Sequence, residues 1–62
     1  MIIIQFRNDE FLPFEQEYYR DSQYMAAQDW YYKTKQVWRE TRLVLENEAD
    51  ATDRVVLMET PG

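Results

Sequence analysis

Residues 37–60 read VWRETRLVLENEADATDRVVLMET, and their interpretation decides the fold. The segment 37–46 is ambiguous alone, because its apolar residues fit a helical spacing as well as an alternating one. Residues 47–53 are polar turn material, and residues 54–60 are rich in β-formers before Pro61 ends them. A strand at 54–60 needs a partner, and 37–46 is the nearest candidate. The pattern therefore predicts a C-terminal hairpin.

The N-terminal third favours strands as well. Residues 2–7 place Ile2, Ile4 and Phe6 on one face, which is typical of a strand. Asn8-Asp9-Glu10 indicates a turn. Residues 11–20 fit either an edge strand or a helix that begins near Pro13, and we favour the strand.

The segment between these two regions has a helical pattern. From Gln23 to about Lys35 the apolar residues recur at helical spacing, with Asp21 or Ser22 as the expected N-cap. The residues expected to face the sheet are Tyr24, Ala27 and Tyr31, with Ala26 and Trp30 beside them. The predicted fold class is α+β: a single domain over residues 1–62, with one helix on a small, mainly antiparallel sheet in the order β(β)αββ.

Composition excludes most catalytic chemistry. The chain has no Cys and no His, one Ser (Ser22) and one Gly (Gly62). Disulfides, the usual zinc sites, Ser-His or Cys-His nucleophiles and glycine-rich phosphate loops are therefore absent. We expect no enzyme activity, no cofactor and no metal.

With a single terminal Gly, turns that need a positive φ are expected to use Asn or Asp. No apolar run is long enough for a membrane helix, so the expectation is a soluble, cytoplasmic protein that does not bind membranes.

The formal net charge is −5, but the charge is unevenly spread. Residues 1–29 carry six acids and two bases, residues 30–45 carry four bases and one acid, and residues 46–62 carry five acids and one base. The basic stretch, WYYKTKQVWRETR at residues 30–42, mixes aromatics with cations, as single-strand binders do. A nucleic-acid-binding module is thus one hypothesis, and its candidate residues are Trp30, Lys33, Lys35, Trp38, Arg39 and Arg42. The acidic flanks would repel a polyanion, which makes nucleic acid an unlikely partner.

The acids support a different hypothesis, in which an acidic face binds a larger protein with a basic surface. The candidate N-terminal acids are Asp9, Glu10, Glu15 and Glu17. The candidate C-terminal acids are Glu46, Glu48, Asp50 and Asp53. The candidate aromatic anchors are Tyr18, Tyr19, Tyr31 and Tyr32.

The leading functional hypothesis is therefore a non-catalytic binding protein, a stoichiometric inhibitor or modulator of a protein that handles nucleic acid. In size, charge and lack of catalytic groups the chain resembles the compact inhibitors that phages and mobile elements make against host nucleases and polymerases, some of which mimic DNA. In a phage the relevant compartment would be the host cytoplasm. A third hypothesis is a structural homodimer that buries the surplus of the ten aromatic residues.

Overall fold

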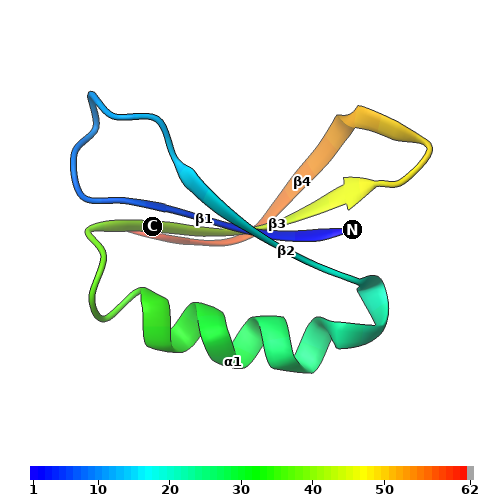
Figure 1. Ribbon diagram of the computed structural model, residues 1–62, viewed down its shortest axis with the longest axis horizontal. Coiled ribbons are helices and arrows are strands. Elements are labelled where there is room, and N and C mark those ends of the chain that lie inside the picture. The colour runs from blue at the N-terminus through cyan, green and yellow to red at the C-terminus, as the bar shows by residue number, and fades with distance from the viewer. Residues whose placement is uncertain (62) are drawn as a thin grey trace.

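The computed structural model describes residues 1–61 and has one helix packed on a four-stranded antiparallel sheet (Figure 1). The sheet order is β2-β1-β3-β4, and the helix lies between β2 and β3 in the chain. The predicted α+β class is confirmed. The elements are β1 (Ile2–Arg7), β2 (Glu15–Tyr19), the 3-10 turn η1 (Asp21–Gln23), α1 (Tyr24–Thr34), β3 (Glu40–Asn47) and β4 (Asp50–Thr60).

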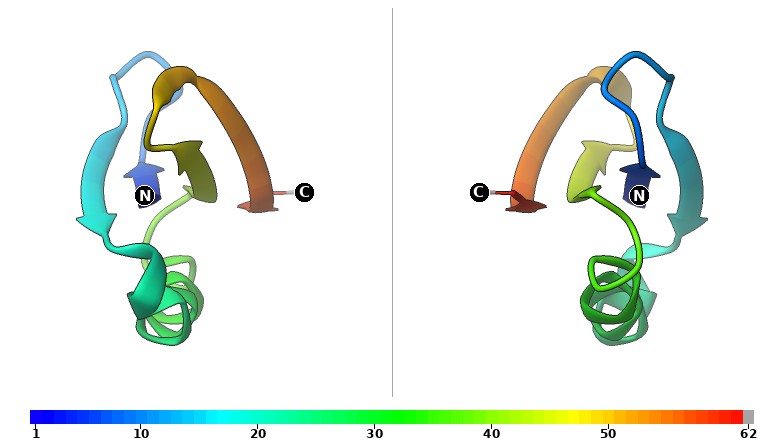
Figure 2. Two further views of the ribbon diagram at one scale, coloured as in Figure 1. Left: turned by 90° about the vertical axis from the view of Figure 1, so that its right-hand side faces the viewer. Right: turned by 90° about the vertical axis from the view of Figure 1, so that its left-hand side faces the viewer.

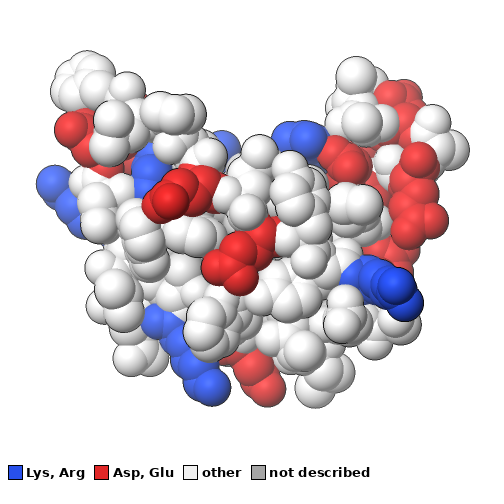
Figure 3. Space-filling model, in the orientation of Figure 1, with Lys and Arg blue, Asp and Glu red and all other residues white. Residues whose placement is uncertain are grey.

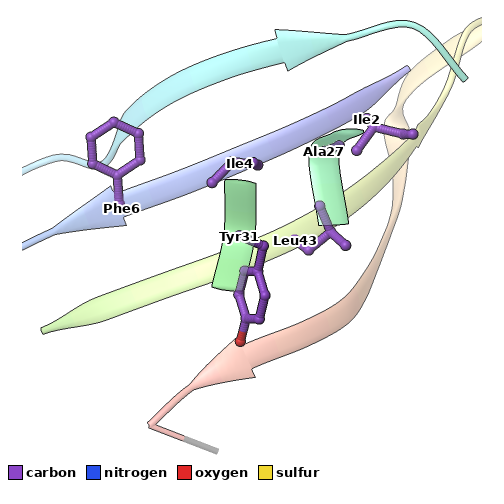
Figure 4. Packing of buried hydrophobic residues seen from close by; sticks show 6 residues of the cluster. All are labelled: Ile2, Ile4, Phe6, Ala27, Tyr31 and Leu43. Atoms are coloured by element: carbon purple, nitrogen blue, oxygen red, sulfur yellow. The ribbon is translucent and has the colours of Figure 1, made fainter. Parts of the chain in front are cut away.

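The core lies between α1 and the two central strands. Ile2, Ile4 and Phe6 of β1 face the helix, as their alternation predicted, and Leu43 of β3 lies beside them (Figure 4). Ala27 of α1 is fully buried on the side of the helix that faces the sheet, and its small side chain allows α1 to approach the sheet closely. Trp38 closes one end of this core, with its ring centroid 4.7 Å from that of Phe6.

The start of α1 differs from the prediction. Neither Asp21 nor Ser22 is the N-cap, because both belong to η1, and Gln23 occupies the cap position. Gln23 Oε1 accepts the N–H of Arg20 at 3.0 Å, so this side chain stabilises the turn into the helix. The predicted extent of the helix is otherwise confirmed, since α1 runs from Tyr24 to Thr34.

The C-terminal hairpin is confirmed, but its loop is shorter than predicted. β3 begins only at Glu40, so Val37 lies outside the strand and is 75% exposed. At the other end Asn47 pairs with Asp50 across a two-residue turn, and residues 51–53 form an irregularity between this pair and the Glu46–Arg54 pair. No residue within 1–61 has a positive φ, contrary to the expectation for Asn and Asp. Asn47 instead uses its side chain, because its Oδ1 accepts the N–H of Ala49 at 2.9 Å.

Residues 11–20 resolve into a loop and a strand. The strand alternative is confirmed for β2, while residues 8–14 form the β1–β2 loop. Figure 2 shows this loop and the β3–β4 hairpin rising from the side of the sheet opposite α1. On that far face Ile3 and Val44 are buried although no helix covers them.

No helix within residues 1–61 is long and apolar enough to cross a membrane.

Candidate partner-binding site

The basic stretch (residues 30–42) does not form one surface. Trp30 and Lys33 lie together on the exposed side of α1, with Lys33 Nζ 5.9 Å from the Trp30 ring centroid. Trp38 instead packs against the core, so it is not free to stack on a base. Arg42 lies on the far face of the sheet, with its guanidinium carbon 4.4 Å from the Phe14 ring centroid.

The remaining members of the stretch are dispersed too. Lys35 follows α1, and its Nζ lies 5.0 Å from the Tyr32 ring centroid. Arg39 lies in the loop before β3, where its N–H donates to Asn8 Oδ1 at 3.0 Å. Among the described residues, Arg42 is the only one of the four bases of the stretch that forms an ion pair, with Nε 4.0 Å from Glu59. The six candidate residues for nucleic acid are therefore split between the surface and C-terminal end of α1, the core, the loop before β3 and the far face of the sheet.

The four candidate aromatic anchors also separate. Tyr18 is exposed on the far side of β2 and Tyr32 is exposed on α1. Tyr19 is half-buried, and burial together with the Glu17 carboxylate raises the pKa of its hydroxyl. Tyr31 is 2% exposed, so its assignment as an anchor is wrong: it fills the core, and its hydroxyl lies 2.9 Å from Thr60 Oγ1.

The N-terminal acids follow the β1–β2 loop and the β2 edge. Asp9 Oδ1 accepts the N–H of Phe11 at 2.9 Å, and Glu10 is exposed beside it. Glu15 and Glu17 lie on the helix side of β2, as their pairing with Phe6 and Ile4 shows. Glu17 accepts a hydrogen bond from the Trp30 indole at 3.2 Å, so part of its hydrogen-bonding capacity is used within the molecule.

The C-terminal acids are not equivalent. Glu46 forms an ion pair with Arg54 at 2.7 Å, and only 12% of its side chain is exposed. It therefore cannot serve as a free acid on the surface, which corrects its assignment as a binding residue. The pKa of Asp50 is lowered because the Thr52 hydroxyl and N–H both donate to its carboxylate, so Asp50 mainly holds its own turn. Glu48 and Asp53 remain exposed at the hairpin.

These exposed acids line a cavity of about 410 Å³ between η1 and the hairpin, which we call the hairpin cavity. Its walls carry four carboxylates, and Leu45 and Val55 provide an apolar lining. In Figure 3 a group of acidic side chains lies over the hairpin at the upper right, and other acidic side chains are spread over the rest of this face. The residues that line the cavity are Asp21, Leu45, Glu46, Asn47, Glu48, Asp53 and Val55.

Sequence reasoning missed four members of the hairpin cavity. Asp21 was considered only as a helix cap, and Leu45, Asn47 and Val55 only as parts of the predicted hairpin. Antiparallel pairing of β1 with β3 brings Met1 next to Glu46, and the Met1 ammonium lies 2.7 Å from Asp21. No sequence pattern marks this proximity, because Asp21 and the hairpin are more than twenty residues apart.

A second cavity, of about 480 Å³, lies under the β1–β2 loop. It contains Asp9, Glu10 and Glu40, but Arg39 shares it. Arg7 is close by as well, and its guanidinium donates to Glu40 and lowers the pKa of that carboxyl group. The acids of this cavity are thus partly neutralised, and the hairpin cavity is the more acidic of the two.

Comparison of the chain with models of known protein families, with curated proteins and with solved structures gave no match. Within residues 1–61, no group of three or more His, Cys, Asp or Glu side chains is arranged to hold a metal ion.

Proposed function

We propose that this protein is a non-catalytic binding module that docks on a basic surface of a larger protein and thereby inhibits or modulates it. The observation that carries the proposal is the hairpin cavity, in which Asp21, Glu48 and Asp53 surround an apolar lining. A lysine or arginine side chain suits such a cavity, because its aliphatic stem packs on apolar atoms while its cationic head meets carboxylates.

The distribution of charge supports the same proposal. Arg54 pairs with Glu46, and the Met1 ammonium lies 2.7 Å from Asp21 and 3.8 Å from Glu48, so two cations face the four carboxylates of the cavity and leave it with a negative charge. A negatively charged site of this kind steers a positively charged partner towards it and speeds encounter. The basic surfaces that nucleic-acid-handling proteins present to phosphates are fitting targets, and occupying one of them would block its normal ligand.

The test is a capture experiment from bacterial lysate with three matched baits. The bound material is eluted in steps of rising salt and analysed for both protein and nucleic acid. The first bait is the unaltered protein. The second carries Asp21→Asn, Glu48→Gln and Asp53→Asn, which remove charge from the hairpin cavity with little change of shape. The third carries Glu10→Gln, Glu15→Gln and Asp29→Asn, which remove the same amount of charge elsewhere.

A partner of the proposed kind is expected to bind the first and third baits and to be lost from the second. Circular dichroism of each bait establishes that it is folded. Equal capture by the second and third baits would overturn the hairpin cavity as the binding site. Release of nucleic acid alone, at modest salt, would favour the nucleic-acid hypothesis instead.

A further inference from the structure

β4 is an outer strand, and one of its edges has no partner strand among residues 1–61. It is eleven residues long, and its central apolar residues Val55, Val56 and Leu57 are 54%, 48% and 39% exposed. Proteins usually protect such edges with short strands, charges or proline, because the unpaired backbone groups bind other strands. The opposite edge is shorter and its charged residues have one sign, since β2 has only five residues and carries Glu15 and Glu17. β4 also carries charged residues, but they are of both signs, so a second β4 can match them.

A bulge in β4 determines which face of the sheet each of its side chains lies on. Leu43 pairs with Met58 and Val44 pairs with Val56, so Leu57 is an extra residue. Without it, Arg54 and Glu59 would lie on opposite faces, because they are an odd number of positions apart. With it, both lie on the far face, where Arg54 is opposite Glu46 and Glu59 is opposite Arg42.

We propose that β4 pairs antiparallel with β4 of a second copy of this chain, with the two-fold axis at Val56. When the bulge residue Leu57 is given no position in the ladder, this register places Arg54 opposite Glu59 of the second copy. Two-fold symmetry repeats the contact on the other side of the axis. It also places Val55 opposite Met58 of the second copy, on the helix side. The two sheets join into one of eight strands.

The charges across the joined sheet alternate in this register. The row on the far face runs from Arg42 to Glu59 in one copy, then to Arg54 and Glu46 in the second. The inner members of the row already form ion pairs within each copy, at 4.0 Å for Arg42–Glu59 and 2.7 Å for Arg54–Glu46. Opposite charges that face each other across strands stabilise their pairing. The edge of β4 is thus complementary to itself.

Other registers lose this match. A shift by one residue brings side chains of opposite faces together. A shift by two places Glu59 opposite Val56 or Thr52 of the second copy, and both charge contacts disappear. Beyond Thr60 the ladder ends, because Pro61 has no N–H to donate. This dimer uses β4 and does not depend on the surplus of aromatic residues that suggested a homodimer from the sequence.

The register is tested with two variants, Arg54→Glu and Glu59→Arg, by sedimentation equilibrium over a wide range of concentration. The unaltered protein is expected to dimerise as concentration rises. Each variant alone places like charges opposite each other at both contacts, and its self-association is expected to be roughly tenfold weaker. An equimolar mixture of the two variants restores opposite charges at both contacts, so the mixture is expected to dimerise again.

A cysteine substitution at the axis gives an independent readout. Because the chain has no Cys, Val56→Cys introduces a single thiol, and the two thiols of a dimer would lie within disulfide range. Rapid oxidation to a covalent dimer is expected for Val56→Cys, but not for Gln16→Cys on the β2 edge. A monomer at all concentrations, no restoration on mixing, or equal oxidation of both cysteine variants would overturn the proposal.

Discussion

Ile4 offers a sharp test of the core, because it lies at the centre of β1 and is fully buried. Ile4→Val removes one methylene group that packs beneath α1. A buried methylene contributes about 0.8 kcal/mol of transfer free energy, and Ile→Val changes in cores cost roughly 0.5–1.5 kcal/mol in all. In a domain of this size about 1 kcal/mol corresponds to a fall in Tm of roughly 4–8 °C.

The assay is thermal unfolding followed by far-UV circular dichroism, with Val37→Ala as the matched control. Val37 loses more apolar atoms in its substitution, but it is 75% exposed, so its Tm is expected to change little. The larger change Ile4→Ala costs about 2–5 kcal/mol, comparable to the total stability of about 3–5 kcal/mol that a core this small supplies. That variant is expected to be largely unfolded. A Tm of Ile4→Val equal to or above that of Val37→Ala would refute this view of the core.

Two further predictions concern hydrogen bonds. Tyr31→Phe removes the 2.9 Å bond to Thr60 and is expected to cost about 0.5–1.5 kcal/mol in chemical denaturation, whereas Tyr18→Phe, at an exposed site, should cost nothing measurable. Glu40→Gln should alter the pH dependence of stability. Because the hydrogen bond from Arg7 lowers the pKa of Glu40 below its ordinary value of 4.5, its contribution is present above that pH and disappears as pH falls through the folded-state pKa. The Tm advantage of the unaltered protein over Glu40→Gln should therefore shrink in acid, and a constant difference would contradict the assignment.

Local periodicity was sufficient to predict most of the fold. The alternation of Ile2, Ile4 and Phe6 predicted β1, and helical spacing predicted α1. The hairpin followed from the need of β4 for a partner. The errors lie at element ends, as with Gln23 replacing Asp21 as the helix cap, where single hydrogen bonds decide and apolar patterns carry no information.

The candidate site was harder to predict, because it depends on which charges find partners across strands. Glu46 and Glu48 are both glutamates of the predicted hairpin, yet Glu46 pairs with Arg54 of β4 at 2.7 Å and Glu48 lies 3.8 Å from the Met1 ammonium. Tyr31 and Tyr32 are adjacent in sequence, and the rotation of α1 buries one and exposes the other. Neither distinction is visible before the register and the helix face are known.

The net charge of −5 opposes the association of two copies, but the distribution of the charges along the hairpin reduces this repulsion. Along the paired part of the hairpin, Arg54 and Arg42 neutralise Glu46 and Glu59. The acids of the hairpin that have no arginine partner within residues 1–61, Glu48, Asp50 and Asp53, lie towards the tip. Because Val56 pairs with Val44 and Asp50 pairs with Asn47, the tip begins three ladder positions from Val56, which is about 10 Å along the sheet. Antiparallel pairing points the two tips in opposite directions, so they lie roughly 20 Å apart along the strands, more than twice the Debye length of about 8 Å at physiological salt. The same arrangement therefore leaves the hairpin tips acidic for a basic partner and the β4 edges neutral enough to meet each other.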